Sequence, residues 1–206
     1  IVTFPQTYDP DNNIKKFPLI IYLHSLQERG NELNLLIDNP DGEGHGIIQT
    51  ALLKSDFDFI TISPLCPDGT FWPLISEKIK KLIDEVILEY PIASEQILLT
   101  GVSMGSMGCW DYAMTYPESI NALVPISGGV YPVVMMKDVE AIVNLPIWAF
   151  HDKGDESIPL EDEVDFINEL KNADANIKYT ITDYGKHYIQ EEVYNDGEIF
   201  EWFLNL

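Results

Sequence analysis

Basic side chains are scarce in this sequence of 206 residues, which has 12 lysines and arginines against 34 aspartates and glutamates. The resulting formal net charge of −22 at pH 7 repels nucleic-acid phosphates and anionic lipid head groups. We therefore expect no nucleic-acid partner and interpret the acidic side chains as a solvated surface. Arginine is rarest of all, since Arg29 is the single one in the chain.

Cysteine is rare too. Cys66 and Cys109 are the two cysteines, and they lack the spacing of metal ligands. One lies beside a predicted strand end and the other inside a predicted helix, which favours buried free thiols and leaves a disulfide as the alternative. The sequence therefore predicts no metal site and no cofactor.

Long apolar runs and an N-terminal leader are absent as well. No segment approaches the ~18 uninterrupted apolar residues of a membrane span. Residues 1–5 lack the basic-then-apolar pattern of a signal peptide, and a first residue other than Met suggests a trimmed chain. We expect a soluble protein, and both cytoplasmic and secreted locations and the oligomeric state stay open.

What the sequence does contain is an alternation of short apolar runs with amphipathic segments. Its 46% hydrophobic content suffices for a full core, and no linker or repeat interrupts it, so a single domain over residues 1–206 is expected. Continuous apolar runs predict buried strands, and helical spacing of apolar residues predicts helices. This alternation is typical of the α/β class, with a mostly parallel central sheet and helices on both faces. The predicted strands cover 18–24, 57–63, 97–102, 122–127, 147–151 and 177–182, and the predicted helices cover 74–90, 104–116, 160–171 and 189–206.

A G-x-S-x-G motif at residues 101–105 follows the predicted strand that starts at Ile97 and precedes a helix-like segment. This is the context of a nucleophile elbow, in which a serine on a sharp turn is held at strained backbone angles. Ser103 is therefore the candidate nucleophile, and the N–H of Met104 is a candidate oxyanion donor at the positive end of the next helix. An ordinary glycine-rich turn is the alternative. Ser106 is a weaker candidate, because methionine rather than glycine stands two residues before it.

Two later loops carry an acid and a base. An acidic loop at residues 151–159 follows one predicted strand, and the loop at 183–187 follows the next and ends in His187. Active groups of such sheets gather at the carboxyl ends of the strands, so these loops should meet Ser103. The order serine, acid, histidine is that of triads on this kind of sheet. His187 would then take the serine proton, and a buried carboxylate would fix its tautomer.

These motifs resemble those of the α/β-hydrolase superfamily, and more narrowly its compact, lidless esterases of the carboxylesterase, feruloyl-esterase and polyhydroxybutyrate-depolymerase-like type, some of them described as predicted peptidases. The resemblance covers nearly the whole chain and implies an α/β-hydrolase fold. The residues that carry it are 19–24 with Glu28, Arg29 and Gly30, then 66–69 with Trp72, 101–105, Trp110 with Tyr116 and Pro117, 125–129, Phe150 and His151 with Asp155 and Pro159, and Gly185 with His187.

The resemblance assigns the nucleophile to Ser103, the acid to Asp155 and the base to His187. Asp152 and Glu156 are the competing acids. Asp152 stands where such proteins usually carry glycine, so it is interpreted as a substitution at that position.

The remaining three histidines have less specific interpretations. The resemblance implies that His24 and His151 are structural hydrogen-bonding groups at strand ends, which is also the ordinary role of a buried histidine. We expect His45 to be exposed.

The loop after the first long strand departs from the family pattern. Relatives usually read His-Gly-x-Gly-Glu-Arg-Gly, whereas Ser25 and Gln27 replace two of these glycines here. We expect the backbone N–H of Leu26 to be an oxyanion donor beside Met104. Non-glycine residues at positive φ would cost about 1 kcal/mol or more, so a strained and slightly reshaped loop is expected.

The predicted function is hydrolysis of short-chain or aryl carboxylic esters, such as hydroxycinnamoyl esters, through a Ser-His-Asp triad and an acyl-enzyme intermediate. The expected partner is a small-molecule ester, and Trp72 and Tyr131 are candidates for its pocket. The stretch 129–145 is too short for a large cap domain, so the site should be open. A serine peptidase with the same triad is one alternative. A non-catalytic binding protein on this fold is the other, with the changes at Ser25 and Gln27 as its signature.

Overall fold

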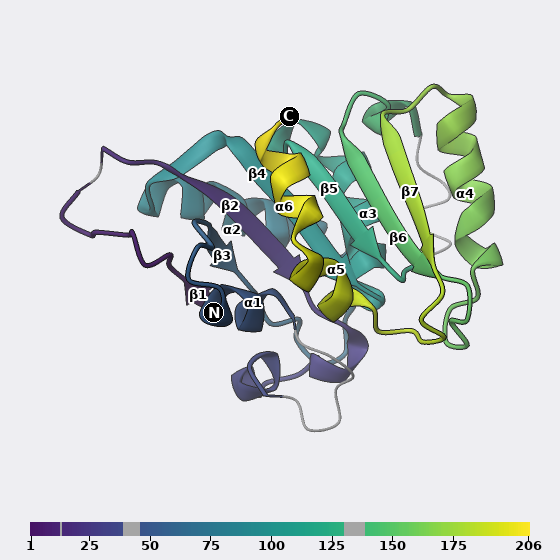
Figure 1. Cartoon of the computed structure of the whole chain (residues 1–206), viewed down its shortest axis with the longest axis horizontal. Helices are drawn as coiled ribbons and strands as arrows, with labels where there is room; N and C mark the ends of the chain where they lie inside the picture. Colours follow the sequence, from purple (N-terminus) through teal and green to yellow (C-terminus); the bar gives the residue numbers. More distant parts are fainter. Residues whose placement is uncertain (13, 39–45, 130–138) are drawn as a thin grey trace.

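A computed structural model describes residues 1–12, 14–38, 46–129 and 139–206 of the chain. Seven strands within these ranges form one sheet, in the order β1-β3-β2-β4-β5-β6-β7 (Figure 1). The short β1 pairs antiparallel with β3, and every other pairing is parallel, which confirms the predicted mostly parallel sheet. The strands are β1 (Val2–Thr3), β2 (Phe17–Leu23), β3 (Ile60–Ile62), β4 (Ile92–Val102), β5 (Ala122–Ile126), β6 (Ile147–Asp152) and β7 (Ile177–Thr182).

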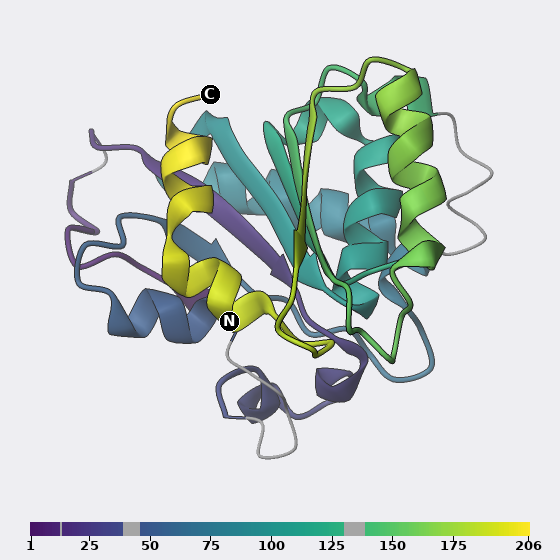
Figure 2. The ribbon, with the colours of Figure 1, turned by 45° about the vertical axis from the view of Figure 1, so that its right-hand side comes forward.

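Helices cover both faces of the sheet, as Figures 1 and 2 show. On one face lie α1 (Ile47–Leu53), α5 (Gln190–Asp196) and α6 (Glu198–Leu204). On the other lie α2 (Ser76–Glu89), α3 (Met104–Thr115) and α4 (Glu161–Asn172). Short 3-10 helices also occur in the connections: η1 (Leu26–Glu28), η2 (Leu33–Leu36), η3 (Trp72–Leu74), η4 (Pro117–Ser119) and η6 (Val139–Ile142).

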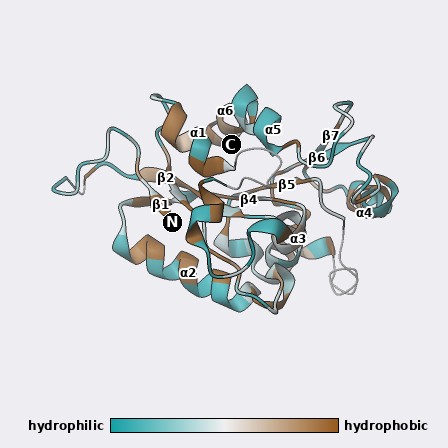
Figure 3. Ribbon diagram, turned by 90° about the horizontal axis from the view of Figure 1, so that it is seen from below, coloured by the Kyte–Doolittle hydropathy of each residue, from teal (hydrophilic) through white to brown (hydrophobic). Residues whose placement is uncertain are grey.

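The sheet is buried on both faces because its strands are apolar at successive positions. In β2, Leu19 and Ile21 point to the core cluster beneath α2, α3 and α4, while Ile20 points to the cluster beneath α1, α5 and α6. Side chains alternate in this way along every strand, so a strand between two helical layers needs a continuous apolar run. Figure 3 shows the two layers from below, with hydrophobic and hydrophilic residues alternating along α2.

The predicted strands and helices agree with the observed ones except at five places. The predicted C-terminal helix is two helices, because Gly197 adopts a left-handed conformation with φ 84° between α5 and α6. α1 and β1 were outside the predicted elements, β3 is shorter than the predicted strand at 57–63, and β4 begins earlier, at Ile92. Cys66 and Cys109 are buried free thiols, as predicted.

No helix in the described ranges is long and apolar enough to cross a membrane. Within the same ranges, no three His, Cys, Asp or Glu side chains are grouped so that they could hold a metal ion.

The parallel strands all end at one edge of the sheet, low in Figure 1. The segments that follow β2, β4, β6 and β7 therefore meet at this edge, and it is there that the candidate residues lie.

Candidate active site

Ser103 occupies the turn between β4 and α3, with φ 56° and ψ −118°. Ser103, Ser127 and Asp174 are the non-glycine residues with positive φ in the part of the chain that the structure describes. A side chain at Gly105 would collide with the carbonyl oxygen of Leu23 in the neighbouring strand. The turn therefore has the geometry expected of a nucleophile elbow, and the motif is not an ordinary glycine-rich turn.

The hydroxyl of Ser103 begins a chain of two hydrogen bonds. Its Oγ lies 2.8 Å from Nε2 of His187, and Nδ1 of His187 lies 2.6 Å from Oδ2 of Asp155. All three residues are buried, with less than a tenth of their surface area exposed. A neutral imidazole that donates from Nδ1 to the carboxylate accepts the serine proton at Nε2, which is the tautomer needed by a general base.

Backbone N–H groups hold the carboxylate oxygen of Asp155 that does not face His187. Its Oδ1 accepts the N–H groups of Ser157 and Ile158, each at 2.9 Å. Burial by itself would raise the pKa of the Asp155 carboxyl, but hydrogen bonds from His151 and His187 outweigh it and hold that pKa well below its usual range. Asp155 is thus an oriented, ionised carboxylate.

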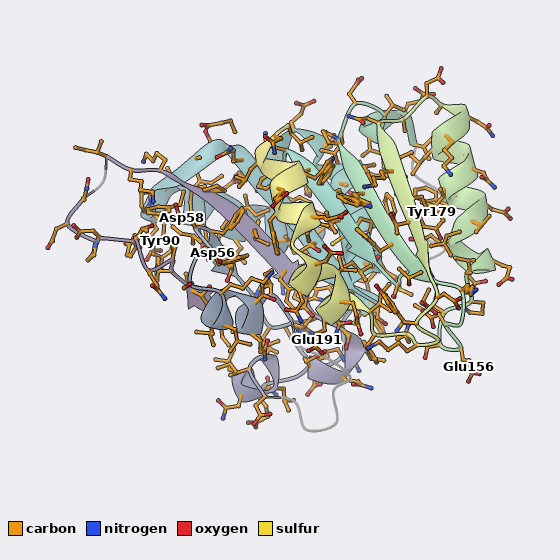
Figure 4. The ribbon with its side chains drawn as sticks, viewed as in Figure 1. Asp56, Asp58, Tyr90, Glu156, Tyr179 and Glu191 are labelled. Carbon is orange, nitrogen blue, oxygen red and sulfur yellow. The ribbon has the colours of Figure 1, made fainter. Side chains whose placement is uncertain are left out.

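The two competing acids have other surroundings. Asp152 is buried and accepts hydrogen bonds from the Thr182 hydroxyl and from the backbone N–H groups of Gly154, Tyr184 and Gly185. Burial by itself would raise the pKa of Asp152, but these hydrogen bonds outweigh it and lower that pKa. These hydrogen-bond partners tie Asp152 to two loops, and none of them is a histidine. Glu156 is exposed at the tip of its loop, and Figure 4 shows it at the periphery of the molecule.

Leu26 and Met104 both line the cavity beside Ser103. Leu26 is the first residue of η1, and Met104 is the first residue of α3. The first N–H groups of a helix have no acceptor within the helix, so they are free to bind an anion. The two residues expected to supply the donors thus line the same cavity as Ser103.

The prediction that Ser25 and Gln27 strain the loop is wrong. Ser25 has an ordinary extended conformation with φ −76°, and Gln27 is part of η1 and is not among the residues with positive φ. Instead of resisting the turn, Ser25 stabilises it: its Oγ accepts the Gln27 N–H at 3.3 Å and donates to Glu28 at 2.6 Å. Ser25 is an N-cap, which is the role that serine fills best at a helix start.

The cavity at Ser103 has a volume of about 390 Å³, within the usual range of ligand pockets. Most of its wall is apolar, and Leu26, Phe71 and Leu74 contribute exposed hydrophobic side chains. The full lining consists of Leu26, Gln27, Phe71, Pro73, Leu74, Ser103, Met104, Met107, Ser157, Ile158, His187 and Tyr188.

Trp72 does not line this cavity, which corrects its interpretation as a pocket residue. Its side chain is 1% exposed, and its indole N–H donates to the carbonyl oxygen of His24 at 2.9 Å. Trp72 therefore supports the end of β2, while its neighbour Phe71 faces the cavity. Tyr131 and His45 lie outside the described residues.

The two strand-end histidines are both fully buried. Nε2 of His24 accepts the backbone N–H of Cys66 at 2.9 Å, and Nδ1 lies 2.6 Å from the carbonyl oxygen of Ser25. His24 therefore carries one proton, and burial lowers its pKa from 6.5. His151 contacts Glu163 at 2.8 Å, a residue that the sequence interpretation missed.

A signal for Glu163 was present in the sequence. Counting back along α4 from the buried Leu170, Ile167 and Phe166, position 163 falls on the same face of the helix. An acidic residue on an apolar stripe has to be paired when buried, whereas a charge elsewhere on the helix is simply solvated. Ser106 is also buried; among the described residues its hydroxyl has no hydrogen-bond partner, and it is not part of the cavity lining.

The model of the phospholipase/carboxylesterase family matches residues 57–199, which is more than half of the chain and includes Ser103, Asp155 and His187. The chain belongs to the phospholipase/carboxylesterase family. The resemblance to α/β-hydrolase esterases is thereby confirmed, and solved members of this fold agree with it.

Three relatives show how far the similarity extends. The chain is 29% identical over 149 residues to an S-formylglutathione hydrolase of Paracoccus denitrificans (strain Pd 1222), covering 61% of this chain and 52% of that protein. It is 26% identical to a thermostable esterase of known crystal structure, with a TM-score of 0.83 over 99% of this chain and 58% of that one. A ferulic acid esterase structure shares the fold, with 14% identity and a TM-score of 0.70 over 98% and 90% of the two chains.

The chain spans about half the length of its curated relative and 58% of the thermostable esterase. The sheet edge with Ser103, Asp155 and His187 nevertheless lies inside the part that matches the phospholipase/carboxylesterase family.

Proposed function

We propose that this chain hydrolyses carboxylic esters, with Ser103 as nucleophile, His187 as general base and acid, and Asp155 as the carboxylate that orients the histidine. The observation that carries the proposal is the unbroken hydrogen-bond chain from Ser103 through His187 to Asp155, which opens onto an apolar cavity. Membership of the phospholipase/carboxylesterase family supports the same chemistry.

In the first half of the reaction, Ser103 Oγ attacks the ester carbonyl carbon while its proton passes to Nε2 of His187. The carbonyl π electrons move to oxygen, and a tetrahedral oxyanion forms. When the oxyanion collapses, the bond to the leaving alkoxy oxygen breaks. That oxygen takes the proton from His187 and leaves as the alcohol, so an acyl group stays on Ser103.

In the second half, His187 removes a proton from water, and the resulting nucleophile attacks the acyl carbon. Collapse of the second oxyanion breaks the bond to Ser103, which regains its proton from His187. The products are a carboxylic acid and the free enzyme. Asp155 stays ionised throughout and stabilises the imidazolium that forms twice.

The oxyanion donors in this proposal are the backbone N–H groups of Leu26 and Met104. They begin η1 and α3 on either side of the cavity, so each is fixed before substrate binds. Donors aimed in advance at the developing charge cost no reorganisation during the reaction.

The apolar wall favours uncharged, hydrophobic acyl or aryl groups. Phe71 and Leu74 expose 38% and 61% of their area, which gives such a group a hydrophobic surface to bury. Within the class of carboxylic esters, we therefore propose short-chain and aryl esters, including hydroxycinnamoyl esters, as substrates. The net charge of −22 disfavours polyanionic ones.

The proposal is tested by labelling with a fluorophosphonate, which reacts with an activated serine whatever the natural substrate. The chain should be labelled once, and Ser103→Ala should lose both the label and the hydrolysis of p-nitrophenyl acetate and methyl ferulate while keeping its fold.

The matched control is Ser106→Ala, three residues further along the chain. Its buried hydroxyl has no hydrogen-bond partner in the part of the chain that the structure describes, so this variant should be labelled and should turn over esters as the original chain does. Labelling that persists in Ser103→Ala would refute the nucleophile assignment.

A further inference from the structure

His151 lies behind the acid of the proposed triad, at the end of β6, and its side chain is 0% exposed. Its Nε2 is 2.9 Å from the carbonyl oxygen of Ile158 and 3.4 Å from Oδ2 of Asp155. This is the same carboxylate oxygen that accepts the proton of His187. One oxygen of Asp155 thus faces two imidazoles.

Both ring nitrogens of His151 face acceptors. A backbone carbonyl oxygen can accept but not donate, so Nε2 carries a proton. Nδ1 lies 2.8 Å from Oε2 of Glu163. The protonation of His151 therefore depends on whether Glu163 is a carboxylate or a carboxylic acid.

The contacts of Glu163 favour the carboxylate. Its Oε1 accepts the indole N–H of Trp110 at 3.2 Å, and an indole can only donate. Its Oε2 accepts the hydroxyl of Tyr179 at 3.3 Å. With His151 these make three donors directed at one fully buried carboxylate, which is the arrangement that a buried negative charge requires.

The network joins four elements of the fold. His151 comes from β6, Glu163 from α4, Trp110 from α3 and Tyr179 from β7, and Figure 4 shows Tyr179 on β7 beside α4. A group held from so many sides has a fixed position, which is what a residue behind a catalytic acid needs.

We propose that His151 is a positioning residue of the active site: a permanently charged imidazolium, held by Glu163, that fixes the Asp155 carboxylate and limits how strongly Asp155 increases the basicity of His187. This inference rests on the proposed function, because it assigns His151 a part in that site. The resemblance to known esterases implied a structural hydrogen-bonding histidine here and nothing about its charge.

Titratable groups on the neighbouring elements affect the charge of His151. Asp155 and Glu163 are the anions that face His151, Tyr179 reaches Glu163, and His187 lies across Asp155. Burial alone would lower the pKa of His151, but the hydrogen bonds with Asp155 and Glu163 outweigh it and raise that pKa to about 10. Burial raises the pKa of Glu163 above 4.5, and the bonds from His151, Trp110 and Tyr179 oppose that shift.

The decisive variant is Glu163→Gln, which keeps the shape and removes the charge. The new amide can accept from Trp110 and donate to Nδ1 of His151, so that His151 needs one proton, at Nε2. Asp155 would then face a neutral ring. Without the positive charge of His151 beside it, the Asp155 carboxylate would raise the basicity of His187 more strongly. A stronger base at His187 moves the acid limb of the pH–rate profile to higher pH, by about one unit for a charge at this range.

Nuclear magnetic resonance of imidazole nitrogens reads the charge directly, without any need for activity. The chain has 4 histidines, so the signals can be assigned from single substitutions. At pH 8, His151 should show two protonated nitrogens in the original chain and one in Glu163→Gln. Glu161→Gln is the matched control, since it removes an exposed charge from the same turn of α4 and should change neither the His151 signals nor the acid limb.

A neutral His151 in the original chain would overturn the proposal, and this measurement stands even if Glu163→Gln does not fold. An imidazolium that survives in Glu163→Gln would remove Glu163 as the partner that holds the charge. An acid limb that does not move once His151 is neutral would remove the effect on His187. Failure of the proposed function is distinguishable, because it would appear as a chain that fluorophosphonate does not label, whatever the state of His151.

Discussion

The C-terminal ends of β2 and β6 each have a fully buried histidine, and both lead into the candidate active site. Directly after β2, His24 accepts one backbone N–H and is neutral, and the segment that follows offers the cavity a backbone donor at Leu26. Near the end of β6, His151 faces acceptors at both nitrogens, and the segment that follows offers a side chain, Asp155. Burial is equal in the two places, so it is the partners that set the charge of each histidine.

The two segments also differ in the amino-acid substitutions that they can tolerate. A backbone donor survives most side-chain changes provided that the turn keeps its shape, which explains how Ser25 and Gln27 can stand in place of glycines. A carboxylate that orients a histidine has no substitute. Replacement of Asp155 should therefore cost more activity than any replacement near β2.

The largest effect is expected for Asp155→Asn. An amide in place of the carboxylate would favour the wrong histidine tautomer and would not stabilise the imidazolium, so kcat should fall by about four orders of magnitude. Single-turnover and steady-state kinetics on p-nitrophenyl acetate measure this loss.

Asp152→Asn is the matched control three residues earlier. Its carboxylate accepts four protein hydrogen bonds, so the amide should lower the free energy of unfolding by about 2 kcal/mol with a far smaller change in kcat. The reverse ranking of the two variants in kcat would move the acid to Asp152.

A smaller effect is expected on the β2 side. Ser25→Ala removes the cap of η1 and its hydrogen bond to Glu28, so the N–H of Leu26 should become less well aimed. Losing an oxyanion donor outright costs about a hundredfold or more, and imperfect aim should cost roughly tenfold in kcat with little change in KM.

Ser94→Ala, at an exposed serine near the start of β4 and at the other end of that strand from Ser103, is the control and should leave kcat unchanged. The pair Ser25→Gly and Gln27→Gly should lower kcat for the same reason as Ser25→Ala. A rise in kcat in that double variant would show that the two residues do strain the turn.

Sequence patterns predicted most of the fold because its strands are buried on both faces. Continuous apolar runs marked β2, β4, β5 and β6, and G-x-S-x-G marked the turn at Ser103, where any larger residue than Gly105 would meet the neighbouring strand. The meeting of Ser103, the acidic loop and His187 followed from the order of the strands, since all three follow strands that end at one edge. The choice of Asp155 within that loop came from the family resemblance.

What the sequence could not supply were the partners of buried polar groups. The N-cap role of Ser25 depends on its backbone angles, and residue type alone suggested strain instead. Trp72 looked like a pocket residue because aromatic loop residues often are, yet its indole binds the β2 end. The Glu163–His151 pair joins two elements in space, and its charge depends on donors from two more.

The smallest effect is expected on the pH dependence of the free energy of unfolding, to which the two histidines should contribute with opposite signs. His151 has a folded pKa raised to about 10 from an unfolded value of 6.5, so folding takes up a proton between these values. Its contribution to stability is complete below pH 6.5 and is lost as pH rises toward 10. His24 has a folded pKa below 6.5, so its contribution is lost as pH falls below 6.5.

Comparing urea unfolding of the original chain with that of Glu163→Gln between pH 6.5 and 8.5 isolates the first contribution, because the N-terminal amine, whose pKa burial lowers from 8.0, and the cysteines, whose pKa burial raises from 9.0, titrate alike in both chains. His151 should lower the free energy of unfolding by about 1 kcal/mol per pH unit in the original chain, since its proton is lost on unfolding. Glu163→Gln should flatten the slope, and the matched Glu161→Gln should retain it. Equal slopes in all three chains would mean that Glu163 does not set the charge of His151, and the contrast between the two strand ends would then not rest on this partner.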